Sequence, residues 1–195
     1  MTTFCTRIRL IPIGILALAL SAQSQKSSET PPRATRMPDG KQWTTQNLNV
    51  KIDASYCYED DEQNCREYGR LYTWESAQRA CQLLGQGWRL PTEEDWRQLA
   101  KRYGRVHDDS EGSGKAAFKA LLTGGNSGFN AVLGGGRAQQ GEYARLKAHG
   151  FYWTASESDA ALAWFVNFGQ GSRTLYLQRD GEKLRAFSVR CVNAN

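Results

Sequence analysis

Four cysteines in the body of the chain are the residues with the most distinctive chemistry: Cys57, Cys65, Cys81 and Cys191. In an oxidising compartment an even number of cysteines predicts disulfides, and four cysteines allow three pairings. Zinc binding is the competing use of thiols. However, no two cysteines have the C-x-x-C spacing of common zinc sites, and the two histidines of the chain are not clustered. We therefore expect two disulfides and no metal site.

The N-terminus indicates where the protein is sent. Arg7 and Arg9 precede an apolar run from Leu10 to Ala22, and polar residues follow this run at once. A basic start and a short apolar run that ends in small residues are typical of a secretory signal peptide. The run is also shorter than the roughly 20 residues that a membrane-spanning helix requires. We expect an exported protein, periplasmic, at the cell surface or secreted, with no membrane span after signal cleavage.

This interpretation divides the chain into three parts. Residues 1–22 are the expected signal peptide, and residues 23–36, with their bias toward Ser, Pro and charged residues, are the expected flexible linker. Residues 37–195 are the expected folded domain. Cys5 precedes the apolar run, whereas the cysteine of a lipoprotein signal follows it, so we expect no lipid anchor.

The charge balance argues against a nucleic-acid partner. The chain has 25 Lys and Arg residues against 20 Asp and Glu residues, and two of the arginines lie in the expected signal peptide. The remaining chain is only weakly basic, and both signs of charge are scattered along it. Nucleic-acid binding needs a concentrated basic stripe, which the sequence lacks.

No group of residues has the spacing of a catalytic site. GSGKAA at Gly112–Ala117 lacks the first glycine and the Ser or Thr of a phosphate-binding loop. Ser156 and Ser158 lack a G-x-S-x-G context. The acidic runs Glu59–Glu62 and Asp108–Glu111 could offer oxygens to a hard cation, but they lack the Gly and Glu spacing of a calcium loop. We predict a non-enzymatic protein without a cofactor.

Helical periodicity is confined to the first two thirds of the chain. Small and apolar residues at i, i+3, i+4 and i+7 predict one helix through Ala77–Leu84 and a second through Trp96–Tyr103, the second capped by Thr92. A third, weaker helix is predicted over Lys115–Leu122. The polar stretch Tyr58–Glu67, enclosed by two cysteines, is predicted to be an acidic loop.

Strand patterns dominate the remainder of the chain. Beyond Gly124, glycines recur between aromatic and β-branched residues, which is typical of an antiparallel sheet. Asp180-Gly181 is the sequence of a tight hairpin turn. One strand is expected early, at Trp43–Leu48, and six follow, near Phe129–Leu133, Glu142–Leu146, Gly150–Ser156, Ala163–Phe168, Thr174–Gln178 and Arg185–Val192. This order predicts an α+β fold, with the helices packed on one side of the sheet.

The predicted elements also suggest a disulfide pairing. Cys81 lies on the apolar face of the first predicted helix, and Cys191 has the same parity as Phe187 and Val189 in the last predicted strand. Both sulfurs therefore face the core. Pairing them links the first helix to the final strand and leaves Cys57–Cys65 as a local link around the acidic stretch.

Six stretches of the sequence carry a resemblance to a known family. They are MPDGKQWTTQNLNV (Met37–Val50), YGRLYTWESAQRAC (Tyr68–Cys81), GWRLPTEEDWRQL (Gly87–Leu99), FYWTASES (Phe151–Ser158), AWFVNF (Ala163–Phe168) and VRCV (Val189–Val192). In this order they resemble the Fibrobacter succinogenes major paralogous (FISUMP) domain of exported bacterial proteins. The resemblance implies a C-type lectin-like fold, in which helices pack on a sheet with long loops and a disulfide joins the first helix to the last strand. It implies no particular ligand.

The resemblance also directs the search for a binding site. Calcium-dependent lectins of this fold use a Glu-Pro-Asn or Gln-Pro-Asp loop and a downstream Trp-Asn-Asp, but neither loop motif occurs here and Trp164–Asn167 reads Trp-Phe-Val-Asn. Aromatic, amide and charged side chains in the ligand-bearing half of the fold suit sugar rings or protein surfaces, although alternating aromatics in a sheet are also typical of a core. The candidate ligand-binding residues are Tyr152, Trp153, Glu157, Trp164, Asn167, Arg173 and Tyr176.

Two functions of different classes follow from these observations. The first is a calcium-independent recognition module that binds a glycan or a cell-envelope protein at the cell exterior. The second is a structural module of surface assemblies without a small ligand. Exposure of the aromatic residues between Trp153 and Tyr176 would favour recognition, and their complete burial would favour the structural function.

Overall fold

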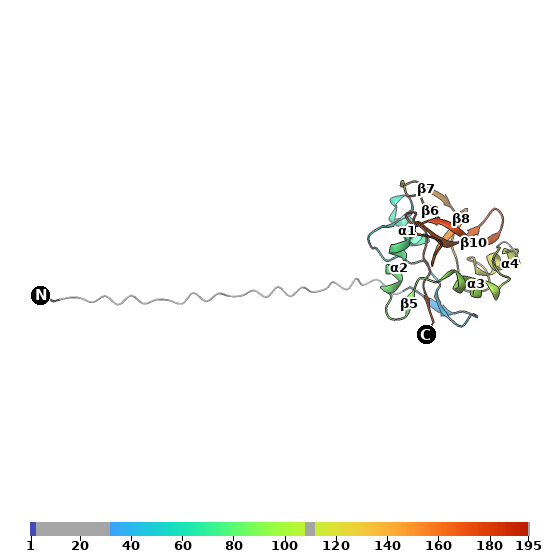
Figure 1. Cartoon of the computed structure of the whole chain (residues 1–195), viewed down its shortest axis with the longest axis horizontal. Coiled ribbons are helices and arrows are strands. Elements are labelled where there is room, and N and C mark those ends of the chain that lie inside the picture. Colours follow the sequence, from blue (N-terminus) through green and yellow to red (C-terminus); the bar gives the residue numbers. More distant parts are fainter. Residues whose placement is uncertain (3–31, 108–111, 195) are drawn as a thin grey trace.

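The computed structural model describes residues 1–2, 32–107 and 112–194. Most of the expected signal peptide and linker, and the acidic run Asp108–Glu111, lie outside the described residues. Helices and strands both contribute to the fold, as predicted (Figure 1). In the described part of the chain, no helix is both long and apolar enough to cross a membrane.

The largest sheet has five strands in the order β10-β9-β8-β6-β7. Adjacent strands within this sheet are antiparallel, except β6 and β8. These two strands are parallel and pair at a single position, between Gly135 and Gly150. The strands are β6 (Gly134–Arg137), β7 (Tyr143–Leu146), β8 (His149–Glu157), β9 (Leu162–Gly169) and β10 (Thr174–Glu182).

Two smaller sheets join segments that are far apart in the sequence. The first is antiparallel and has the order β1-β2-β11-β5, so it brings the start of the domain beside its end. Its strands are β1 (Ala34–Arg36), β2 (Gln42–Thr44), β11 (Val192–Asn193) and β5 (Trp88–Arg89). The second pairs β3 (Ser55–Tyr56) with β4 (Leu71–Tyr72). The domain therefore includes Ala34–Arg36, which the sequence analysis placed in the flexible linker.

Helices cover both faces of the central strands. Along β8 and β9, successive side chains point to opposite faces. One set packs with α3 (Glu93–Lys101) and α4 (Lys115–Leu121), and the other packs with α2 (Trp74–Gln82). Figure 1 shows α2 on one side of the domain and α3 and α4 on the other. Both faces of these strands are consequently part of a hydrophobic core, so the prediction that the helices pack on one side of the sheet was wrong.

Helix α3, the second helix that the sequence predicts, starts with the expected cap. The Thr92 hydroxyl accepts a hydrogen bond from the backbone N–H of Asp95, and the Asp95 carboxylate accepts one from the backbone N–H of Thr92, which is a capping box. Burial alone would raise the pKa of Asp95, but hydrogen bonds from Arg89, Thr92 and Lys41 outweigh it and lower the pKa to about 2. Asp95 is therefore ionised at neutral pH and ties α3 to Arg89 and Lys41.

Both predicted disulfides are present. Cys81 on α2 is bonded to Cys191, 110 residues later, and Cys57 is bonded to Cys65, eight residues later. The long link joins the first core helix to the end of the chain, as the shared inward orientation of its two cysteines predicted.

The polar stretch that was predicted to be a loop is helical. Residues Tyr58–Asp60 form a short 3-10 turn, η1, and Glu62–Tyr68 form helix α1. The Asp61 carboxylate accepts a hydrogen bond from the backbone N–H of Gln63 and so caps α1. High polarity indicated a loop, but a capped helix that is tied to η1 by the Cys57–Cys65 disulfide tolerates an exposed polar face.

Three strand predictions were wrong in detail. Phe129–Leu133 forms only an isolated bridge, and the strand starts at Gly134. Asp180 and Gly181 lie within β10, at a bulge, instead of in a turn. A Cβ atom at Gly181 would lie 2.7 Å from the Trp153 ring, so close packing requires this glycine. Arg185–Val192 is a chain of bridges to several partners and not one regular strand.

The two disulfides should differ in their contribution to stability. Replacing Cys81 and Cys191 together by Ser should lower the free energy of unfolding by about 4 to 5 kcal/mol, and the same change at Cys57 and Cys65 by about 2 to 3 kcal/mol, because the longer loop gains more entropy on release. Urea unfolding of both double variants measures the difference. An equal loss in the two variants would contradict the loop-entropy explanation.

Candidate ligand-binding site

The structure removes two of the candidate residues from any ligand surface. Tyr152 and Trp153 are adjacent on β8, so they point to opposite faces of the sheet, and both are 0% exposed. Tyr152 packs in the core on the side of α3 and α4, and Trp153 packs on the side of α2. The prediction assumed that one face of the sheet was open. It is wrong for these two residues because helices cover both faces.

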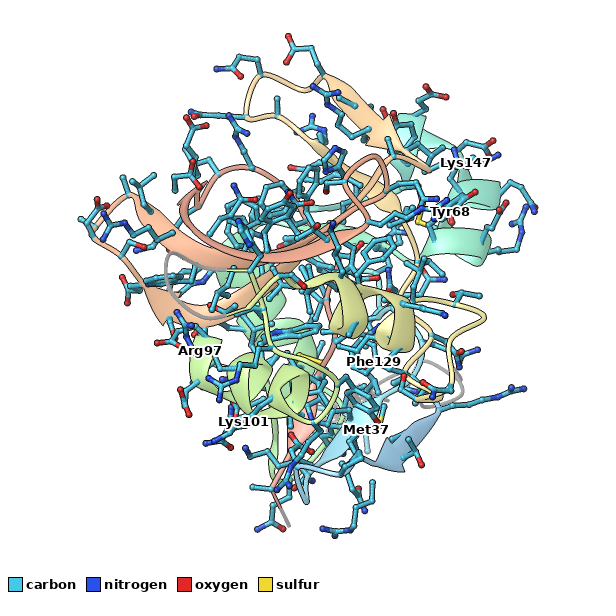
Figure 2. All side chains as sticks on the ribbon, turned by 90° about the vertical axis from the view of Figure 1, so that its right-hand side faces the viewer. Met37, Tyr68, Arg97, Lys101, Phe129 and Lys147 are labelled. Atoms are coloured by element: carbon cyan, nitrogen blue, oxygen red, sulfur yellow. A yellow bond between two sulfur atoms is a disulfide. The ribbon has the colours of Figure 1, made fainter. Side chains whose placement is uncertain are left out.

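Trp164 and Asn167 do not share a surface either, because their separation of three residues on β9 places them on opposite faces. Trp164 is half-buried beside α3, where the Arg97 guanidinium lies 5.9 Å from the centre of its ring. Figure 2 shows Arg97 at the outer edge of the domain.

Glu157 and Arg173 lie near opposite ends of β9. Glu157 is exposed at the end of β8 and forms an ion pair with Lys183 at 2.5 Å. Arg173 is exposed in the turn between β9 and β10, with a positive φ of 51°. The predicted set is therefore divided among several surfaces and does not form one site.

Asn167 and Tyr176 remain together, on the face that α2 covers elsewhere, and a histidine joins them. The side chains of His149, Asn167 and Gln178 form a row across β8, β9 and β10. The Asn167 amide donates to Gln178 Oε1 at 2.8 Å, so its own oxygen accepts from His149 Nδ1 at 2.9 Å. His149 was not among the predicted site residues, although its parity matches that of Phe151 on β8.

A polar pocket of about 380 Å³ lies elsewhere in the domain. We call it the amide pocket, because four of its residues are Gln46, Asn47, Asn49 and Asn130. Six separate segments contribute to it. The lining residues are Arg33, Thr45, Gln46, Asn47, Asn49, Cys65, Arg66, Glu67, Tyr68, Gly69, Thr123, Asn130, Val132 and Arg190.

Two of the amides are available to a ligand. Gln46 and Asn49 are exposed, and their side chains have no hydrogen-bond partner among residues 32–107 and 112–194. Asn47 lies between them in the sequence but is buried, and it donates to the carbonyl of Tyr68 at 2.8 Å. The segment thus directs one amide into the protein and leaves two at the pocket.

On one side of the pocket, the backbone at the end of α1 lies very close to the segment that carries Asn47. Gly69, at the C-terminal end of α1, has a φ of 76°. A Cβ atom there would lie 2.6 Å from Cβ of Asn47 and 2.9 Å from the carbonyl oxygen of Leu48. Only glycine allows both the conformation and the contact.

The floor of the pocket is held by a buried arginine. Arg190 is 0% exposed, and its guanidinium donates to Asn47 Oδ1 at 2.7 Å and to the backbone carbonyls of Thr44, Phe129 and Asn130 at 2.9, 2.8 and 2.6 Å. Figure 2 shows Phe129 beneath α4. These four bonds fix the segments that carry Asn47 and Asn130, so they set the shape of the pocket.

The charges around the pocket are not balanced. Arg33, Arg66 and Arg190 line it together with one carboxylate, Glu67. Burial, reinforced by the hydrogen bond to Glu67 and by its charge, raises the pKa of Tyr68 to about 12. The Tyr68 hydroxyl therefore stays protonated at neutral pH.

The described residues offer one cluster with metal-ligand chemistry, formed by Cys57, Glu62 and Cys65. The two sulfurs are joined in a disulfide, and Arg70 Nη1 lies 3.3 and 3.4 Å from them. A disulfide beside a guanidinium is a poor cation ligand, because thiolates are the species that bind metals. The cluster therefore does not suggest a metal site.

Two tryptophan variants distinguish core from surface among the predicted residues. Trp153→Ala should lower the free energy of unfolding by about 3 to 5 kcal/mol, because it empties a fully buried volume and leaves the carbonyl of Tyr72 without the Trp153 indole donor. Trp164→Ala should cost about 1 to 2 kcal/mol, since its ring is already partly exposed. Urea unfolding measures both; a larger loss for Trp164→Ala would contradict this arrangement of the sheet.

Comparison with known sequences gives the family. Residues 30–193 match the Fibrobacter succinogenes major domain, so the match covers the central strands, both disulfides and the amide pocket. No curated protein and no solved structure matches the chain. The chain belongs to the Fibrobacter succinogenes major domain family.

Proposed function

We propose that this protein is an exported, non-enzymatic recognition module that binds a glycan in the amide pocket without calcium. The observation that carries the proposal is the pair of unpartnered amides, Gln46 and Asn49, at a hollow large enough for a small ligand. Ligand pockets in proteins have volumes of about 300 to 1,000 Å³.

The chemistry of the lining favours a sugar over an apolar ligand. A primary amide has two donor hydrogens and an acceptor oxygen, and a sugar hydroxyl is both donor and acceptor, so the two form hydrogen bonds in either direction. The lining has few apolar side chains, so an apolar ligand would leave these amides desolvated and unpaired, which costs binding energy.

Calcium independence and export rest on the sequence. The Glu-Pro-Asn, Gln-Pro-Asp and Trp-Asn-Asp motifs of calcium-dependent lectins are missing from the chain. Two buried disulfides are consistent with an oxidising compartment. The link between α2 and the end of the chain also supports our proposal that the fold is a divergent form of the C-type lectin-like fold.

One observation favours the structural alternative. Tyr152 and Trp153 are completely buried, as expected of a structural module, whereas Trp164 and Tyr176 remain partly exposed. The amide pocket does not depend on those side chains being exposed. We therefore place ligand binding at the pocket and keep the structural function as the outcome that a failed ligand search would support.

A glycan array followed by calorimetry tests the proposal. For any glycan that binds, Asn49→Ala and Gln46→Ala should each weaken the affinity by about three- to tenfold, the effect of one or two lost hydrogen bonds. Gln140→Ala, which removes an exposed amide from the turn between β6 and β7, is the matched control and should have no effect. A chelator should not change the affinity.

Three results would count against the proposal. Loss of binding in the presence of a chelator would show that calcium is required. Normal affinity in both pocket variants, together with weaker binding of Tyr176→Ala, would move the site to the face of the sheet. Binding of no glycan, with capture of a cell-envelope protein or of nothing, would favour a protein ligand or the structural function.

A further inference from the structure

The three arginines of the amide pocket form no ion pair with any acidic residue that the structure describes. The guanidinium of Arg66 donates to Gln63 Oε1 at 2.9 and 2.6 Å, and that of Arg190 donates to an amide and three carbonyls, all of them uncharged. Among the residues that the structure describes, no Asp or Glu forms an ion pair with Arg33, Arg66 or Arg190. The pocket therefore has three positive charges and the single negative charge of Glu67.

The charge of Arg190 is the most consequential of the three. A charge that is withdrawn from water without a counter-charge raises the energy of the folded protein, even when its hydrogen bonds are complete. Burial lowers the pKa of Arg190, and Tyr152 is the one neighbour that opposes this shift. An anion in the adjoining pocket would supply the missing counter-charge across a short, poorly solvated distance, where electrostatic attraction is stronger than in water.

We infer that the amide pocket selects acidic saccharides, which carry a carboxylate or sulfate group beside their hydroxyls, over neutral saccharides of the same shape. This inference rests on the proposed function, because it names the class of glycan that the same pocket binds. Gln46 and Asn49 recognise the hydroxyls. Arg33 and Arg66, both exposed at the pocket, attract the anionic group directly, and Arg190 does so through its field.

Glu67 does not cancel this preference. It is an exposed residue in the last turn of α1, and it supplies one negative charge against three arginines. The remaining balance is positive. Because two of the arginines are exposed, the preference should weaken as salt screens them.

Three disaccharides that differ at one position test the inference: cellobiose, cellobiuronic acid and cellobiose 6′-sulfate. Each is titrated into the isolated exported protein with its disulfides intact, with affinity measured by calorimetry and the site located by NMR shifts of backbone amides. At least one of the two acids should bind about tenfold or more tightly than cellobiose and shift the signals of Asn49, Gly69 and Asn130. Which acid binds more tightly separates a carboxylate ligand from a sulfate ligand.

The double variant Arg33→Gln/Arg66→Gln identifies the groups responsible. It should reduce the ratio of acid to neutral affinity by about threefold or more while the protein remains folded, because exposed arginines contribute little to stability. Arg179→Gln removes one exposed arginine from β10 and is the control that should keep the ratio.

Equal affinity for the acids and cellobiose at the pocket would overturn the inference and leave the proposed function intact. An acid preference that survives the double variant, or shifts confined to another face, would also overturn it. If none of the three disaccharides moves the pocket signals, the inference fails. The proposed function fails with it only if the glycan array also yields no ligand for the pocket.

Discussion

The buried C-terminal segment from Ala186 to Asn193 is the constraint on which the rest of the structure depends. All eight of its residues are buried, yet it forms no long regular strand. Instead it bridges in turn to β6, β4 and β8, then bonds to the segment after β2, and ends between β2 and β5. Each neighbouring element is thus held against the same short stretch of backbone. Two adjacent side chains secure it in different directions, since Cys191 is bonded to α2 and Arg190 donates to the segments that carry Asn47 and Asn130.

This arrangement makes the candidate site a consequence of the core. The guanidinium of Arg190 holds the floor of the amide pocket with the bonds that also fix the C-terminal segment. The pocket should therefore be largely formed before a ligand arrives, which lowers the entropy that binding must overcome. The same side chain introduces a buried positive charge, and the structure places no carboxylate of the described residues against it. Arg190 thus contributes both to the shape of the pocket and to its positive charge, which a β-strand sequence such as VRCV does not by itself reveal.

The sequence predicted those features that depend on local periodicity. The inward faces of α2 and α3, the capping box at Thr92 and the Cys81–Cys191 pairing follow from residue spacing, and all are present. The binding site depends on tertiary arrangement and could not be predicted in the same way. Nothing in the pattern of β8 shows that both faces are covered, although the odd separation of Trp164 and Asn167 already placed them on opposite faces. The amide pocket combines six segments. The local sequence pattern that could have indicated it is Gln46, Asn47 and Asn49 after a strand, because three amides in four residues are more than a turn requires.

The central claim is that the hydrogen bonds of Arg190, and not its charge, hold the domain together. The most direct test is the free energy of unfolding of Arg190→Lys, measured with urea beside Arg185→Lys. Lysine keeps the charge but has three donors on one nitrogen, so it cannot satisfy four acceptors that surround a planar guanidinium. We expect Arg190→Lys to lose about 3 kcal/mol or more, and Arg185→Lys, at an exposed arginine paired with Glu182, to change by less than about 0.5 kcal/mol. A loss below about 1 kcal/mol for Arg190→Lys would contradict the claim, because the buried acceptors would then have found other partners at little cost.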